Sequence, residues 1–121
     1  MTAVAAAIHA YNAGREPRLL ALKYERLRIS PFVFLRGTCH LFFDRLAVLE
    51  PPVDAPMAWA CGDLHLENFG SYKGDNGLTY FDINDFDESA LAPAHWDLLR
   101  CLTSLLLAAR QFDASSAKAA R

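Results

Sequence analysis

The sequence predicts an α+β fold in which helices flank a small antiparallel sheet. Apolar residues recur at helical spacing near both ends of the chain, over residues 19–27 and 96–107. Between these stretches, short apolar runs are separated by glycine-rich turn residues, which is typical of strands and hairpins. The 121 residues, 53% of them hydrophobic, can form one domain or part of a larger one.

Two helices are expected in the first thirty residues. The stretch from Ala3 to Asn12 is rich in alanine, and Gly14 is a suitable stop. A second helix is expected from Pro17 with a broad face of leucines and a basic opposite face. Ser30-Pro31 ends it, because the residue before a proline avoids helical geometry.

The next segment is ambiguous. The run from Phe32 to Leu35 fits either a short strand or a tight buried turn, because its length does not decide between them. Thr38 is expected to cap a third helix that continues to about Leu49. Three prolines then form a stiff linker into the middle of the chain: Pro51, Pro52 and Pro56.

The middle of the chain is expected to contain strands and two acidic loops. An apolar strand from Met57 to Cys61 ends at a glycine and is followed by four polar residues: Asp63, His65, Glu67 and Asn68. Phe69 to Tyr72 and Leu78 to Ile83 then predict a hairpin, because the five residues between them have turn composition. A second acidic cluster follows: Asp82, Asp85, Asp87 and Glu88.

A helix from about Ala94 to Arg110 is expected after this cluster. It is apolar over most of its circumference, which predicts deep burial. Asp113 is expected to cap a further helix that has barely begun at Arg121. The chain is therefore interpreted as the N-terminal fragment of a larger protein. One partial domain is expected, with a helical segment at 1–56, the loops at 57–93 and supporting helices at 94–121.

Composition excludes several classes of function. A net charge of −2 gives no basic field that would favour nucleic acid. The three scattered cysteines lack metal-ligand spacing, so buried reduced thiols are expected. No apolar run approaches the roughly 18 to 20 residues that span a bilayer. A cytoplasmic protein without a membrane partner is expected.

The acidic loops suit phosphoryl transfer, which requires positioning and charge neutralisation more than covalent chemistry. Asp63 can accept a proton from an attacking hydroxyl, while Asn68, on the same loop, can bind a metal ion. Asp85 can supply a second ligand, although Asp82 and Asp87 compete for this assignment. Oxygen ligands of this kind suit magnesium.

The loops also carry a family resemblance. The run Gly62-Asp63-Leu64-His65-Leu66-Glu67-Asn68 resembles the catalytic loop of proteins similar to aminoglycoside phosphotransferases, choline kinases and protein kinases. Asn84-Asp85-Phe86-Asp87 resembles their metal-binding segment. The chain is more closely similar to the bacterial family called domain of unknown function 2252. This similarity rests on the segments 30–37, 61–70, 84–88 and 96–100.

The resemblance implies a kinase-like catalytic-lobe fold and a role for each site residue. It implies that Asp63 is the catalytic base and that His65 braces its loop. It also implies that Asn68 and Asp85 bind Mg²⁺ beside ATP, and that Arg36 meets a phosphate or pairs with a carboxylate. Two further features follow in the same way: Asp97 anchors the catalytic loop from a helix start, and the acceptor is an unspecified hydroxyl of a small molecule or protein.

Some kinase features are absent from these residues. No glycine-rich loop or lysine-bearing strand precedes Asp63, and Lys23 lies in a helical pattern. The resemblance implies that the nucleotide-covering elements follow Arg121. Two alternatives stay open: a metal-dependent phosphoesterase, whose metal site also begins with Gly-Asp-x-His, and a non-catalytic, pseudokinase-like fragment. Glu67 and Glu88 are expected to be solvated or structural.

Overall fold

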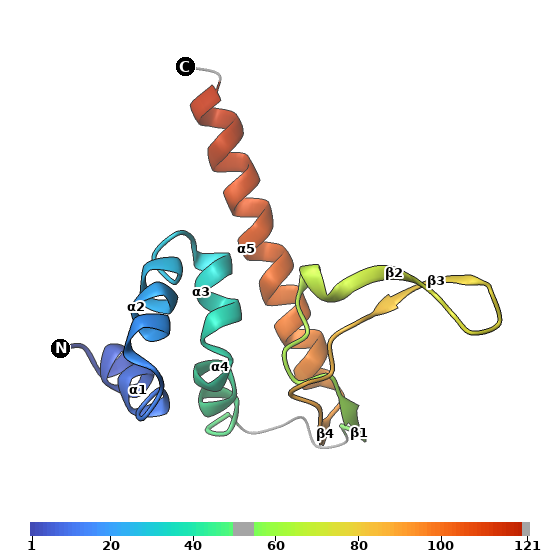
Figure 1. Cartoon of the computed structure of the whole chain (residues 1–121), viewed down its shortest axis with the longest axis horizontal. Helices are drawn as coiled ribbons and strands as arrows, with labels where there is room; N and C mark the ends of the chain where they lie inside the picture. Colours follow the sequence, from blue (N-terminus) through green and yellow to red (C-terminus); the bar gives the residue numbers. More distant parts are fainter. Residues whose placement is uncertain (50–54, 120–121) are drawn as a thin grey trace. The chain divides into compact units, whose positions relative to one another are not determined.

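The computed structural model describes residues 1–49 and 55–119, with side chains up to residue 112. Its described elements combine helices with two separate antiparallel pairs of strands, which confirms the α+β class (Figure 1). The chain divides into two compact units, one of Met1–Glu50 with Gln111–Arg121 and the other of Pro51–Arg110. Among the described helices, none is long and apolar enough to cross a membrane.

The first unit contains four short helices: α1 (Ala3–Tyr11), α2 (Pro17–Arg26), α3 (Pro31–Gly37) and α4 (Cys39–Leu46). The first two confirm the predicted helices. Gly14 follows α1 with a φ of 80°, a conformation that suits a residue without Cβ. Asn12, fully buried after α1, donates to the carbonyl of Ile8 at 2.7 Å and accepts from Lys23 of α2 at 3.1 Å.

The expectation of a strand or turn at Phe32 to Leu35 is wrong, because these residues lie in α3. Ser30 caps this helix by accepting the Val33 amide at 3.2 Å, and Pro31 occupies the first helical position. Proline is favoured there because its fixed φ suits a helix and its missing N–H would have no helical partner. The Ser-Pro pair therefore begins a helix as well as following one.

The helix expected from Thr38 to Leu49 is shorter than predicted, since α4 ends at Leu46. The Thr38 side chain does not cap it. Its hydroxyl donates instead to the carbonyl of Phe34, one turn earlier, at 2.6 Å. Threonine often bonds to a preceding helical carbonyl in this way.

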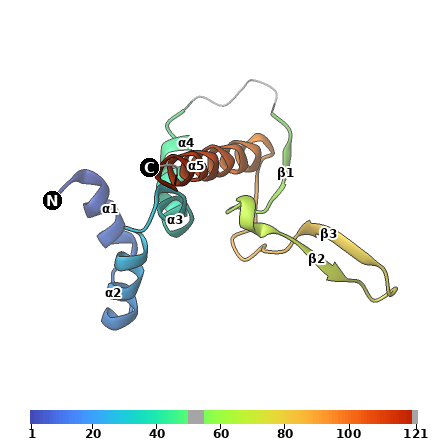
Figure 2. The same cartoon turned by 90° about the horizontal axis from the view of Figure 1, so that it is seen from above.

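In the second unit, β1 (Met57–Ala60) confirms the strand expected before the first acidic loop. It pairs with β4 (Ala90–Pro93), a strand that was not predicted from the sequence. The predicted hairpin is confirmed as β2 (Phe69–Lys73) and β3 (Thr79–Ile83). It projects away from α5 in both views (Figure 1, Figure 2).

The last element, α5 (His95–Ala119), is one continuous helix rather than the two that were expected. No glycine or proline lies after Pro93, so nothing in the sequence interrupts it at Asp113. The expected deep burial is also wrong. One face, with Arg100, Ser104 and Ala108, is buried. Several leucines of this helix are exposed: Leu98 (58%), Leu99, Leu102, Leu105 and Leu106 (66%).

Candidate functional site

The two acidic loops, residues 61–68 and 84–89, lie directly against each other. The Cys61 thiol donates to the carbonyl of Asp85 at 2.8 Å. The amide of Asn84 donates to the carbonyl of Asn68 at 2.9 Å. These bonds tie the loop that follows β1 to the loop that follows β3.

A glycine is required where the loops come closest. Gly62 has a φ of 92°, and a Cβ built there would lie 2.1 Å from the carbonyl oxygen of Glu88. Any larger residue would displace the second loop, because such an overlap is impossible. The Gly-Asp pair therefore does more than end the strand, since its glycine lets the second loop approach.

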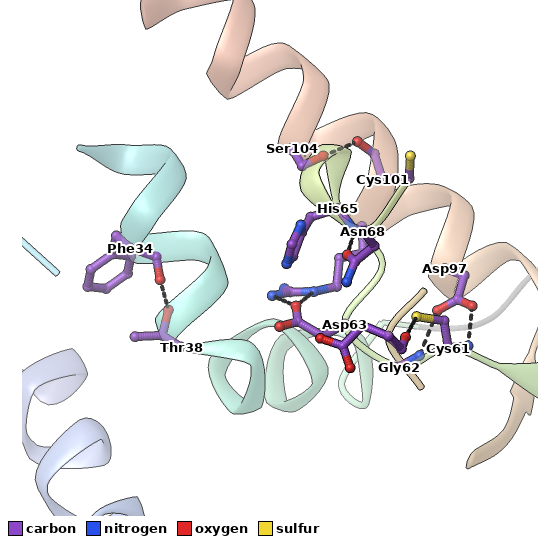
Figure 3. Close-up of polar contacts among 12 residues, drawn as sticks. Phe34, Thr38, Cys61, Gly62, Asp63, His65, Asn68, Asp97, Cys101 and Ser104 are labelled. Carbon is purple, nitrogen blue, oxygen red and sulfur yellow. Dashed lines mark hydrogen bonds and ion pairs between the residues drawn. The ribbon is translucent and has the colours of Figure 1, made fainter. Parts of the chain in front are cut away.

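Helix α5 fixes the first loop at both ends (Figure 3). Asp97, in its first turn, accepts the amides of Cys61 at 2.6 Å and Gly62 at 3.1 Å. Further along the helix, the hydroxyl of Ser104 accepts the Leu66 amide at 3.0 Å. The anchoring position that the resemblance implied for Asp97 is therefore present in the geometry.

Asp63 lies between these anchors and forms an ion pair with Arg100 of α5. The Arg100 Nε donates to Asp63 Oδ1 at 2.5 Å, and Nη2 contacts the same oxygen. The arginine side chain is fully buried, whereas that of Asp63 is 24% exposed. Within the described part of the chain, Asp63 Oδ2 accepts no hydrogen bond.

The surroundings of Asp63 raise the pKa of its carboxyl group above the ordinary value of 3.8. Burial is the main cause, because it disfavours the charged form. Glu88 adds repulsion, and the carboxylate oxygens of the two residues lie within 4.8 Å of each other. Arg100 and His65 act in the opposite direction without cancelling the effect of burial. Asp63 is therefore a stronger proton acceptor than an exposed aspartate.

His65 holds the loop in shape through two reciprocal bonds. Its Nδ1 accepts the Glu67 amide at 3.2 Å, and its own amide donates to Asn68 Oδ1 at 2.7 Å. These bonds form a capping box for the short 3₁₀ helix η1 (Leu66–Asn68). With Nδ1 accepting, a neutral ring carries its proton on Nε2. This arrangement corresponds to the bracing role that the resemblance implied.

The two candidate metal ligands differ in their surroundings. Asn68 is buried, and its Oδ1 already accepts one hydrogen bond, although an amide oxygen has two lone pairs. Asp85 is exposed, and its Oδ1 accepts the Asp87 amide at 3.3 Å. The competing Asp82 accepts the amide of Ile83 at 2.8 Å.

The thiol of Cys61 is affected by the charges of both acidic loops. Burial and, after it, repulsion from Asp97, Asp85 and Asp63 together raise its pKa from 9.0 to about 11. The two loop carboxylates thus both lie within electrostatic range of one buried sulfur atom. Arg36, the other candidate, lies exposed on α3 in the first unit and stays a sequence-based prediction.

Three residues contribute to the site in ways that were not predicted from the sequence: Arg100, Ser104 and Glu88. The signal for the first two was their spacing: with Asp97 they occupy positions i, i+3 and i+7 of a leucine-rich helix, which is one face. Glu88 was expected to be solvated or structural. Its backbone does pack on Gly62, but its carboxylate also acts on Asp63.

Comparison with protein families matches residues 15–121 to the family described as "Uncharacterized protein conserved in bacteria (DUF2252)". The match covers most of the chain, so the chain belongs to this family. Comparison with curated proteins and with solved structures found no match. The family assignment thus confirms the closer of the two resemblances seen in the sequence.

Proposed function

We propose that the two loops form the phosphoryl-transfer site of a kinase-like phosphotransferase, which uses ATP and Mg²⁺ and a hydroxyl acceptor. One observation carries the proposal: the loop bearing Asp63 is packed directly on the loop bearing Asp85. Phosphoryl transfer depends on placing a proton acceptor and charge-neutralising groups close together.

Asp63 is the proposed base. Its Oδ1 is held by Arg100, and its Oδ2, which accepts no bond from the described residues, is the oxygen proposed to meet the acceptor hydroxyl. The raised pKa of Asp63 supports this role, because a base is more effective as its pKa approaches the working pH.

Asn68 and Asp85 are the proposed ligands of Mg²⁺. Their amide and carboxylate oxygens fit the preference of this ion, and Asp85 keeps one carboxylate oxygen outside its bond to the Asp87 amide. When bound, Mg²⁺ supplies positive charge against the nucleotide phosphates. Arg36 stays a sequence-based prediction, either as a contact for a phosphate or as the partner of a carboxylate.

Magnesium-dependent nucleotide binding tests the proposed site. We expect ATP with Mg²⁺ to raise the melting temperature of the wild-type protein, and Asp85→Asn to remove this effect. Asp75→Asn, in the exposed hairpin turn, is the matched control and should respond as the wild type does. An equal response of both variants would contradict the assignment of Asp85.

Transfer from ATP tests the proposed base. Asp63→Asn should lower the transfer rate by about 10² to 10⁴-fold, because the proton acceptor is lost, and should leave nucleotide binding nearly intact. Equal loss of binding and transfer would contradict the role as base. Mn²⁺-dependent hydrolysis of a generic phosphodiester, lost in Asp63→Asn, would instead favour a phosphoesterase. No response to nucleotide or metal would favour a non-catalytic protein.

A further inference from the structure

The buried face of α5 carries three polar side chains, and each binds a successive part of the first acidic loop. Asp97 binds the amides at the start of the loop, and Ser104 binds the amide of Leu66. Arg100 lies between them and binds the carboxylate of Asp63. The seven steps along the chain from Asp97 to Ser104 span about 10 Å of helix axis, so the helix aligns the loop along its length.

Arg100 binds Asp63 in a way that distinguishes the two carboxylate oxygens. Its Nε donates to Oδ1, and its Nη2 contacts the same oxygen rather than Oδ2. The guanidinium is planar and its donors are fixed relative to each other, so two donors on one oxygen restrict rotation of the carboxylate. Because Arg100 is fully buried, water competes little for these donors.

We infer that Arg100 is a positioning residue for the proposed base. It fixes the orientation of the Asp63 carboxylate and leaves Oδ2 for the acceptor hydroxyl. The part of this inference that concerns the hydroxyl rests on the proposed function. The part that concerns the orientation and charge of Asp63 does not.

Several charged or titratable groups among the described residues of the second unit act on or near the Asp63 carboxylate. Arg100 faces it from α5, His65 from the same loop and Glu88 from the second loop, while Cys61 precedes it in the chain. Of these, Arg100 is the largest influence that favours the charged carboxylate. Its removal should therefore move the titration of Asp63 to higher pH. A lysine in its place would keep the charge but not the planar pair of donors.

The test compares Arg100→Met, which removes the charge, with Arg100→Lys, which keeps it. Arg110→Met is the matched control, because Arg110 is exposed on the same helix. Carbon-13 NMR of the aspartate carboxyl groups, with the Asp63 signal assigned through Asp63→Asn, gives the titration. We expect Arg100→Met to titrate Asp63 at higher pH than the wild type. Arg100→Lys should stay near the wild type, and Arg110→Met should match it.

Transfer kinetics separate positioning from charge. In Arg100→Lys, kcat should fall about a hundredfold while the KM for ATP stays unchanged, because a misplaced base slows chemistry without weakening nucleotide binding. An unchanged Asp63 titration in Arg100→Met, or a wild-type kcat in Arg100→Lys, would overturn the inference. If Arg100→Met does not fold, the kcat of Arg100→Lys decides.

The two proposals can fail separately. A shifted titration in Arg100→Met without ATP-dependent transfer by the wild type would support the link between Arg100 and Asp63 and reject the proposed function. Transfer that requires Asp63 but is indifferent to both changes at Arg100 would support the function and overturn the inference.

Discussion

Cys61 is the residue whose chemistry reports most directly on the packing of the two loops. Its thiol donates to the Asp85 carbonyl and lies within electrostatic range of Asp97, Asp85 and Asp63. Burial and these charges favour the protonated thiol and raise its pKa to about 11. The thiol therefore favours the folded state below its ordinary pKa of 9.0. This contribution is lost as the pH rises through about 11.

Alkylation with iodoacetamide at pH 8 should consequently be slow at Cys61. Only about one thiol in a thousand is ionised three pH units below its pKa, and the thiolate is the form that reacts. We expect labelling at least about tenfold slower than in the urea-unfolded chain, with a rate that still rises above pH 9. Mass spectrometry of the labelled peptides measures this. Labelling as fast as in the unfolded chain would contradict the described packing.

At the scale of elements, the contact between the two loops depends on Gly62. Gly62 and Gly77 both have positive φ, near 92° and 80°. A Cβ at Gly62 would overlap the backbone of Glu88, whereas a Cβ at Gly77 would meet nothing within 4 Å. Comparing substitutions at these two glycines therefore separates the cost of backbone strain from the cost of moving the second loop away.

Gly77→Ala should lower the free energy of unfolding by about 1–2 kcal/mol, the usual cost of a left-handed conformation for alanine. Gly62→Ala should cost more, at least about 3 kcal/mol, because the second loop must also move. Urea denaturation followed by circular dichroism measures both. Equal costs would show that the loops do not pack closely at Gly62.

Local signals predicted many of the elements. The helix beginning at Pro17 and the hairpin around Gly77 carry their own punctuation in the sequence, so they were predicted within a few residues. The strand β4 was missed because Ala90–Pro93 is short and is defined by its pairing with β1, far away in the sequence. Ser30-Pro31 predicts the end of a helix, but in the structure it also begins α3.

Site residues that belong to a sequence motif could be predicted. Those contributed by a distant part of the chain could not. The Gly-Asp-x-His run pointed to Asp63, and the resemblance implied that Asp97 anchors the loop. Arg100 was not predicted, because a single arginine among leucines looks like one exposed position of an apolar helix. Its partner lies 37 residues earlier, and only the fold brings the two together.

At the scale of the whole molecule, α5 has two faces of different character. Arg100, Ser104 and Ala108 are buried on one face. Leucines on the other face, including Leu102 and Leu106, stay exposed among the described residues. Burial within the described part of the chain therefore does not account for all the apolar residues of this helix.

The double variant Leu102→Gln, Leu106→Gln should change the free energy of unfolding by less than about 1 kcal/mol, because neither side chain is buried. It should also reduce binding of the dye ANS, since exposed apolar surface is removed. Ala108→Gln, on the buried face, is the matched control and should destabilise by at least about 1–3 kcal/mol. A loss above 2 kcal/mol in the double variant would mean that these leucines are buried in solution.

The most direct test of the central claim is paramagnetic broadening of backbone NMR signals by Mn²⁺ in the presence of a non-hydrolysable ATP analogue. If the two loops form one site, the amide signals of residues 63–68 and 84–88 should broaden together at low Mn²⁺, and those of the acidic hairpin turn around Asp75 should not. Broadening that affects Asp75 as strongly as Asp85, or that is confined to one of the two loops, would contradict the claim.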